Sequence, residues 1–111
     1  MSSGFYLLLL FVAAVLEAGG DALVRTGLHS NLLVRRAEFL LLGGVVLFSY
    51  GVVVNLPRWD FGRLLGVYVA MFFLVAQLIN YFAFGQKPSV SIIVGGVLII
   101  GGGLIISLWR T

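Results

Sequence analysis

Long apolar runs alternate along the chain with short polar connections. The four apolar runs cover residues 5–24, 39–56, 64–84 and 90–109, and each is 18–21 residues long. A helix rises about 1.5 Å per residue, so about 20 apolar residues cross the roughly 30 Å of hydrocarbon in a bilayer. The pattern predicts an all-α membrane protein in which residues 1–111 form one domain of four transmembrane helices with short loops.

The connections at residues 25–38, 57–63 and 85–89 contain residues typical of turns and of membrane interfaces. Pro57 stops a helix, Pro88 suits the start of one, and Trp59 and Trp109 suit headgroup depth. The first run also resembles the apolar region of a signal peptide. No Lys or Arg precedes it, however, so we expect it to be kept as a span.

The composition supports a membrane protein and excludes several other classes. Hydrophobic residues make up 61% of the chain and charged residues 10%. A soluble domain contains about 45–50% apolar residues and about 25% charged residues. With no cysteine and a single histidine, the chain lacks the usual groups for disulfides, zinc or thiol catalysis. The cations lie singly at the ends of apolar runs, which does not indicate nucleic-acid binding. We expect no enzyme, no metal and no cofactor, but a multi-pass protein of the cell (inner) membrane.

Positive charge is almost balanced between the two sides of the membrane. Four spans place both termini on one side together with Arg58, Arg63 and Arg110. The other side has four cations, which are Arg25, Arg35, Arg36 and Lys87. Because the difference in Lys and Arg orients a membrane protein, this weak bias either still fixes one topology or allows insertion in both orientations. We favour dual insertion, which would let two copies form an antiparallel homodimer like the inverted repeats of transporters.

Glu17 is the main candidate for chemistry. It lies about 2.5 residues past the midpoint of the first run, which is roughly 4 Å along a helix. An ionised side chain near the bilayer centre costs roughly 2.5–3.5 kcal/mol on insertion scales, so such residues are functional by default. The alternative is a protonated Glu17 that hydrogen-bonds between helices. We expect Glu17 to bind a proton or a cationic substrate.

Other polar and aromatic side chains inside the spans are candidate accessory residues of the same site. These candidates are Asp21, Ser49, Tyr50, Tyr68, Gln77 and Asn80. Asp21 either pairs with Arg25, the reading we favour, or forms an acidic vestibule below Glu17. For Gln77 and Asn80 we favour interhelical hydrogen bonds over substrate contact. Tyr68 fits an aromatic wall for a cation or the interfacial belt equally well.

Glycines recur at a spacing of seven residues in the last run. Gly95 and Gly102 share one face of a helix, as do Gly96 and Gly103. Small residues on one face let membrane helices approach closely, either within one chain or between two chains. We favour the second reading and predict a dimer interface at these four glycines.

Several local motifs stand out along the chain: Glu17, Gly20, Leu23 and Arg25 in the first run, Pro57, the segment Phe84-Gly85-Gln86-Lys87, and Gly95 and Gly102. In these motifs, in length and in number of spans, the chain resembles the small multidrug resistance family of the drug/metabolite transporter superfamily. The third run departs from the family, because the Tyr and Trp of the family motif are absent there. The resemblance implies an antiparallel dimer in which two copies of Glu17 bind either protons or a cation.

The sequence therefore predicts a secondary transporter that exchanges protons for a small or lipophilic cation. Its expected partners are a second copy of the same chain, the lipid bilayer, protons and the cation. One alternative is a lipid carrier or flippase subunit of the same superfamily, with Arg58 and Arg63 at an anionic headgroup. A second alternative is a membrane scaffold that does not transport anything, although this function would not explain the carboxyl group of Glu17 inside a span.

Overall fold

The computed structural model describes residues 3–109 and consists there of four α-helices. They are α1 (Ser3–Leu28), α2 (Leu33–Val54), α3 (Phe61–Phe84) and α4 (Val90–Leu108). All four are long and apolar enough to cross a membrane. The prediction of an all-helical protein with four membrane-spanning helices is confirmed.

The helices begin and end according to local capping residues as well as hydrophobicity. Between α1 and α2 only residues 29–32 are non-helical, which is shorter than the predicted connection at residues 25–38. Helices extend past the hydrocarbon region because each further turn forms hydrogen bonds between its own backbone N–H and C=O groups. The Asp60 side chain caps α3 by accepting from the Arg63 backbone N–H at 3.1 Å, and Ser89 caps α4. Gly85 ends α3 in a left-handed conformation with a φ of 65°, which suits glycine.

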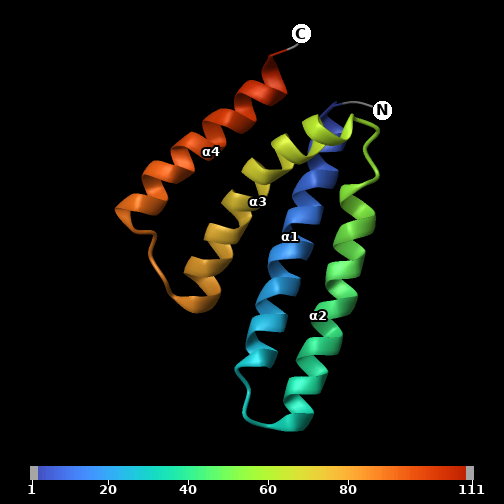
Figure 1. Ribbon diagram of the computed structural model, residues 1–111, viewed down its shortest axis with the longest axis vertical. Helices are drawn as coiled ribbons and strands as arrows, with labels where there is room; N and C mark the ends of the chain where they lie inside the picture. Colours follow the sequence, from blue (N-terminus) through green and yellow to red (C-terminus); the bar gives the residue numbers. More distant parts are fainter. Residues whose placement is uncertain (1–2, 110–111) are drawn as a thin grey trace.

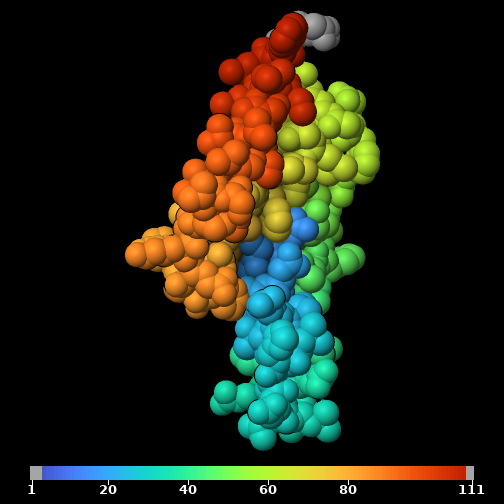
Figure 2. Space-filling model, turned by 60° about the vertical axis from the view of Figure 1, so that its left-hand side comes forward, coloured from blue at the N-terminus to red at the C-terminus, as the bar shows by residue number. Residues whose placement is uncertain are grey.

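The helices form an open, flat arrangement rather than a closed bundle. Within the described part of the chain, α1 packs against α2 and α3, while α4 packs against α3 alone (Figure 1). The chain measures 53 × 34 × 18 Å. The start of α1 and the end of α4 lie at the same end (Figure 1). The α1–α2 hairpin extends beyond the α3–α4 connection at the other end (Figures 1 and 2).

The buried core lies where α1 meets α3 and the end of α2. On α1, three alanines, Ala13, Ala14 and Ala18, lie beside Leu10 and let the neighbouring helices approach closely. The opposing residues are Val54, Leu64, Val67, Tyr68 and Val75. This close approach brings the middle of α1 against the first half of α3.

Glycines bring α4 into contact with α3. A methyl group at Gly103 would meet the Cβ of Ala70, and one at Gly96 would lie 2.7 Å from the Cε2 of Phe73. Gly96 and Gly103 therefore pack within the chain, although we predicted them at a dimer interface together with Gly95 and Gly102. No described residue lies within 4 Å of a methyl group built at Gly95 or Gly102, so these two glycines face away from the described part of the chain.

Candidate functional site

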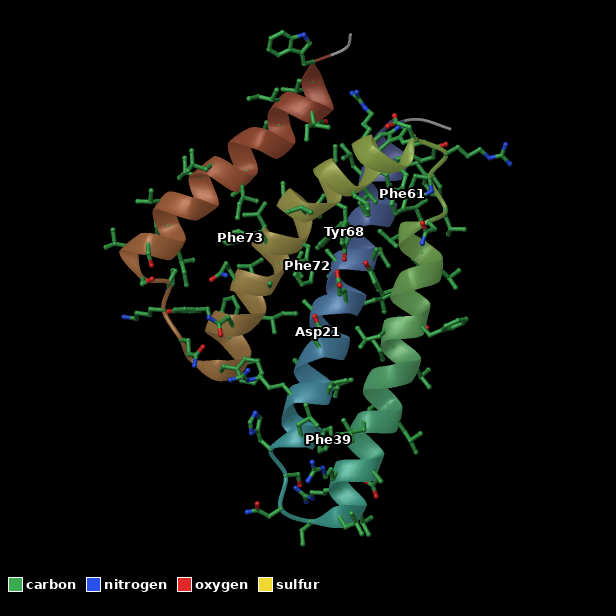
Figure 3. All side chains as sticks on the ribbon, viewed as in Figure 1. Asp21, Phe39, Phe61, Tyr68, Phe72 and Phe73 are labelled. Atoms are coloured by element: carbon green, nitrogen blue, oxygen red, sulfur yellow. The ribbon has the colours of Figure 1, made fainter. Side chains whose placement is uncertain are left out.

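The centre of the candidate site is a hydrogen bond between Glu17 and Tyr68. Glu17 is partly buried and lies 1.5 residues past the midpoint of α1, or about 2 Å along the helix. The Tyr68 hydroxyl donates to Oε1 of Glu17 at 2.6 Å. This distance is in the range of charge-assisted bonds between a hydroxyl and a carboxylate. Figure 3 shows Tyr68 between α3 and α1, with Asp21 below it on α1.

Tyr68 lies inside the protein, so of the two alternatives for this residue the interfacial belt is wrong. Only 4% of the side chain is exposed, and the neighbouring residues Leu64 and Val67 are buried with it. The close packing of α3 against the alanines of α1 carries the phenol to the middle of the membrane span. A buried tyrosine hydroxyl needs a hydrogen-bond partner, and Glu17 supplies it.

Three aromatic rings form a row beside Glu17. The centroids of Tyr50 on α2 and Tyr68 on α3 are 5.7 Å apart, and those of Tyr68 and Phe72 are 6.0 Å apart. The faces of such rings attract cations. Our sequence reasoning named the two tyrosines but missed Phe72, which follows Tyr68 by one helical turn and is identifiable by that spacing.

No basic side chain neutralises Glu17 in the part of the chain that the structure describes. Its hydrogen-bonding partner is a neutral phenol. Arg25, the cation on the same face of α1, is eight residues away, which is about 12 Å along the helix. An ionised Glu17 therefore needs a positive charge from outside the described part of this chain.

A cavity of about 260 Å³ opens between α1 and the second half of α3, beyond the Glu17–Tyr68 pair. Its polar lining consists of Asp21, Arg25, Gln77 and Asn80. Asp21 and Arg25 form no ion pair among the described residues, so the favoured prediction of that pair is wrong. Such a pair gains little free energy in a solvated position, which leaves both side chains free to line the cavity.

The predicted interhelical hydrogen bonds of Gln77 and Asn80 are also not formed in the described residues. The Oε1 atom of Gln77 is buried and has no hydrogen-bond partner among residues 3–109. The reason is geometric, because both amides border the cavity. We had expected a polar group of another helix at that place. An unpaired buried carbonyl of this kind is an unused acceptor.

Two other polar residues that the sequence singled out, Ser49 and Arg63, donate to backbone carbonyl groups. The Ser49 hydroxyl donates to the Val45 carbonyl at 3.0 Å within α2, and so it is satisfied by its own helix. The Arg63 guanidinium donates to the Ser107 carbonyl at 3.0 Å, which ties the start of α3 to the end of α4. Arg63, which the lipid-carrier alternative used for a headgroup, thus has a structural contact.

Comparison with known proteins gives one informative match. A UPF0060 membrane protein of Staphylococcus carnosus (strain TM300) is 32% identical over 105 residues, which cover 93% of this chain and 94% of that protein. No family model matches the chain, and no solved structure matches it. The relative's description as a membrane protein agrees with the four spans found here, and the assignment to a multi-pass membrane protein is confirmed. The resemblance to the small multidrug resistance family is not confirmed by these matches.

Proposed function

The chain belongs to the UPF0060 membrane protein family, and we propose that it is a secondary transporter that exchanges protons for a small or lipophilic cation at Glu17. One observation carries the proposal. A carboxyl group lies near the middle of a membrane span, is held by a tyrosine hydroxyl and has no basic partner in the described chain.

The cost of burying a charge gives the physical reason for exchange. An unpaired carboxylate near the bilayer centre costs roughly 2.5–3.5 kcal/mol, and either a proton or a bound cation removes that cost. One carboxylate does not hold both at once, so each displaces the other. The aromatic row of Tyr50, Tyr68 and Phe72 supplies ring faces for a cation at the same place.

The proposed working unit is an antiparallel homodimer. The chain is only 18 Å thick in one direction, and in its described part α4 packs against α3 alone. It is therefore too thin to enclose a path for a substrate. A second copy in the opposite orientation would cover the site, as inverted repeats do in larger transporters. The nearly balanced cations at the two ends of the helices support insertion in both orientations. The open face at Gly95 and Gly102 is available for helix contact between the copies.

Transport by the purified protein in liposomes tests the proposal. We expect an outward-directed proton gradient to drive uptake of tetraphenylphosphonium or methylammonium, with protons leaving as the cation enters. Glu17→Gln is nearly isosteric and cannot ionise, so it should abolish both fluxes. Glu17→Asp keeps the charge on a shorter side chain and should retain weak exchange.

Glu38→Gln is the matched control, because Glu38 is an exposed carboxylate near the start of α2. This variant should transport like the unmodified protein. Equal cation-driven proton fluxes for the Glu17→Gln variant and the unmodified protein would overturn the assignment of Glu17. The absence of any coupled flux with either cation would overturn the transport proposal.

A further inference from the structure

The cavity between α1 and the end of α3 is separate from the Glu17–Tyr68 pair, because neither residue lines it. Its walls contain one acidic and one basic side chain, Asp21 and Arg25, that form no ion pair with each other in the described chain. They also contain Gln77, whose Oε1 is buried and has no hydrogen-bond partner within the described part of the chain. The cavity thus has a negative group and a positive group that are unpaired in the described chain, and an unused acceptor lies buried in its wall.

These groups are arranged in a fixed order along the cavity. Asp21 lies one helical turn from Glu17, and Arg25 lies one turn beyond Asp21, nearer the end of α1 at Leu28. Each turn of four residues is about 6 Å along the helix. The negative charge is therefore deeper in the membrane than the positive charge. Phe72 and Ile79 form an apolar wall on the α3 side, and Figure 3 shows Phe72 between α3 and α1.

We propose that this cavity binds a small zwitterion with a primary ammonium group and an acid group, of the free amino acid type. The ammonium group donates to the Asp21 carboxylate, and the acid group accepts from the Arg25 guanidinium. An apolar side chain of the ligand packs against Phe72 and Ile79. A volume of about 260 Å³ suits a ligand of this size, because pockets for drug-sized molecules begin near 300 Å³.

Two other ligands fit the charges less well. A simple cation would be attracted by Asp21 and repelled by Arg25, which line the same cavity. The headgroup of phosphatidylethanolamine also carries an ammonium and an acid group. In a leaflet, however, its phosphate lies deeper than its ammonium group, which is the reverse of the order of Arg25 and Asp21. The observations therefore favour a free solute, and the site does not depend on the proton exchange proposed above.

Calorimetric titration of the full chain in phosphatidylcholine nanodiscs tests the proposal, with empty nanodiscs as the blank. The ligands are L-leucine, 3-methylbutylamine, which lacks the acid group, and 4-methylpentanoate, which lacks the ammonium group. All three share one apolar side chain. We expect L-leucine to bind at least about tenfold more tightly than either analogue, since each analogue leaves one charged partner unused. Equal binding of the amine, or no binding of L-leucine, would overturn the proposal.

Variants then assign the contacts. Asp21→Asn and Arg25→Gln should each weaken L-leucine binding about tenfold or more, and Arg25→Gln should remove the preference for L-leucine over the amine. Glu38→Gln and Arg35→Gln change the same groups at exposed positions outside the cavity and should leave binding unchanged. Unchanged binding in Asp21→Asn would overturn the assignment. Displacement of L-leucine when phosphatidylethanolamine is added to the nanodiscs would show that a lipid headgroup is the ligand.

Discussion

The contact between α4 and α3 is weakened most directly by adding one methyl group at Gly103. A Cβ there would meet the Cβ of Ala70, which is fixed to the backbone of α3 and cannot rotate away. Carbon atoms in contact need about 3.5–4.0 Å, so α4 would have to move outward by roughly 1 Å or more. Overpacking of this kind costs about 1–3 kcal/mol. We expect Gly103→Ala to have a lower free energy of unfolding than a glycine-to-alanine substitution that meets no neighbour.

Gly102→Ala is the matched control for this substitution. Replacing a helical glycine by alanine stabilises a helix by about 1 kcal/mol wherever it occurs, and this gain is common to both variants. A methyl group at Gly102 meets nothing within 4 Å. The difference between the two variants therefore isolates the contact with Ala70. Gly103→Ala should be less stable than Gly102→Ala by about 1–3 kcal/mol.

Unfolding by sodium dodecyl sulfate, followed by circular dichroism in mild detergent micelles, measures these free energies. The double variant Gly103→Ala with Ala70→Gly moves the methyl group from α3 to α4. It should recover most of the loss once the effect of Ala70→Gly alone is subtracted. Equal stabilities of Gly103→Ala and Gly102→Ala, or no recovery in the double variant, would refute the packing of α4 against α3 at this position.

Three further predictions address the site, a helix cap and the topology. Tyr68→Phe keeps the ring but removes the hydroxyl that donates to Glu17. Because a hydrogen bond to a charged group contributes about 1.5–3 kcal/mol, cation–proton exchange in liposomes should fall about tenfold or more. Unchanged exchange in this variant would contradict the role of Tyr68. Asp60→Ala removes the cap on the Arg63 backbone N–H and should lower the free energy of unfolding by about 1 kcal/mol, whereas Asp60→Asn should retain most of it. Reporters fused to the C-terminus should be active on both sides of the membrane, and two lysines added between residues 57 and 60 should force one orientation; one-sided reporters in the unmodified protein would exclude dual insertion.

The helices and the position of Glu17 were predictable from the sequence because each depends on one segment alone. Runs of 18–21 apolar residues have few stable forms in a bilayer other than a spanning helix. A carboxyl group inside such a run is conspicuous without any knowledge of its neighbours. The glycine spacing of α4 likewise showed that Gly95 and Gly102 share one face and that Gly96 and Gly103 share another.

The contacts between distant segments were not predictable in the same way. Tyr68 and Glu17 are separated by 51 positions, and the sequence does not show which face of α3 meets α1. The i, i+4 spacing of Asp21 and Arg25 favours an ion pair, but the divergence of α3 from α1 leaves a cavity there. Packing against Ala70, rather than spacing, distinguishes Gly103 from Gly102.

The distance between Glu17 and Arg25 has a consequence for the proposed exchange. A basic residue next to Glu17 would neutralise its charge permanently and leave no reason to bind a proton or a cation. Arg25 is instead about 12 Å away along α1 and forms no ion pair with Glu17 in the described part of the chain. The Tyr68 hydroxyl supports both states of the carboxyl group, because it donates to the ionised form and also has lone pairs that accept from the protonated form. A neutral partner that serves both states keeps Glu17 in place while the positive charge that neutralises it is exchanged.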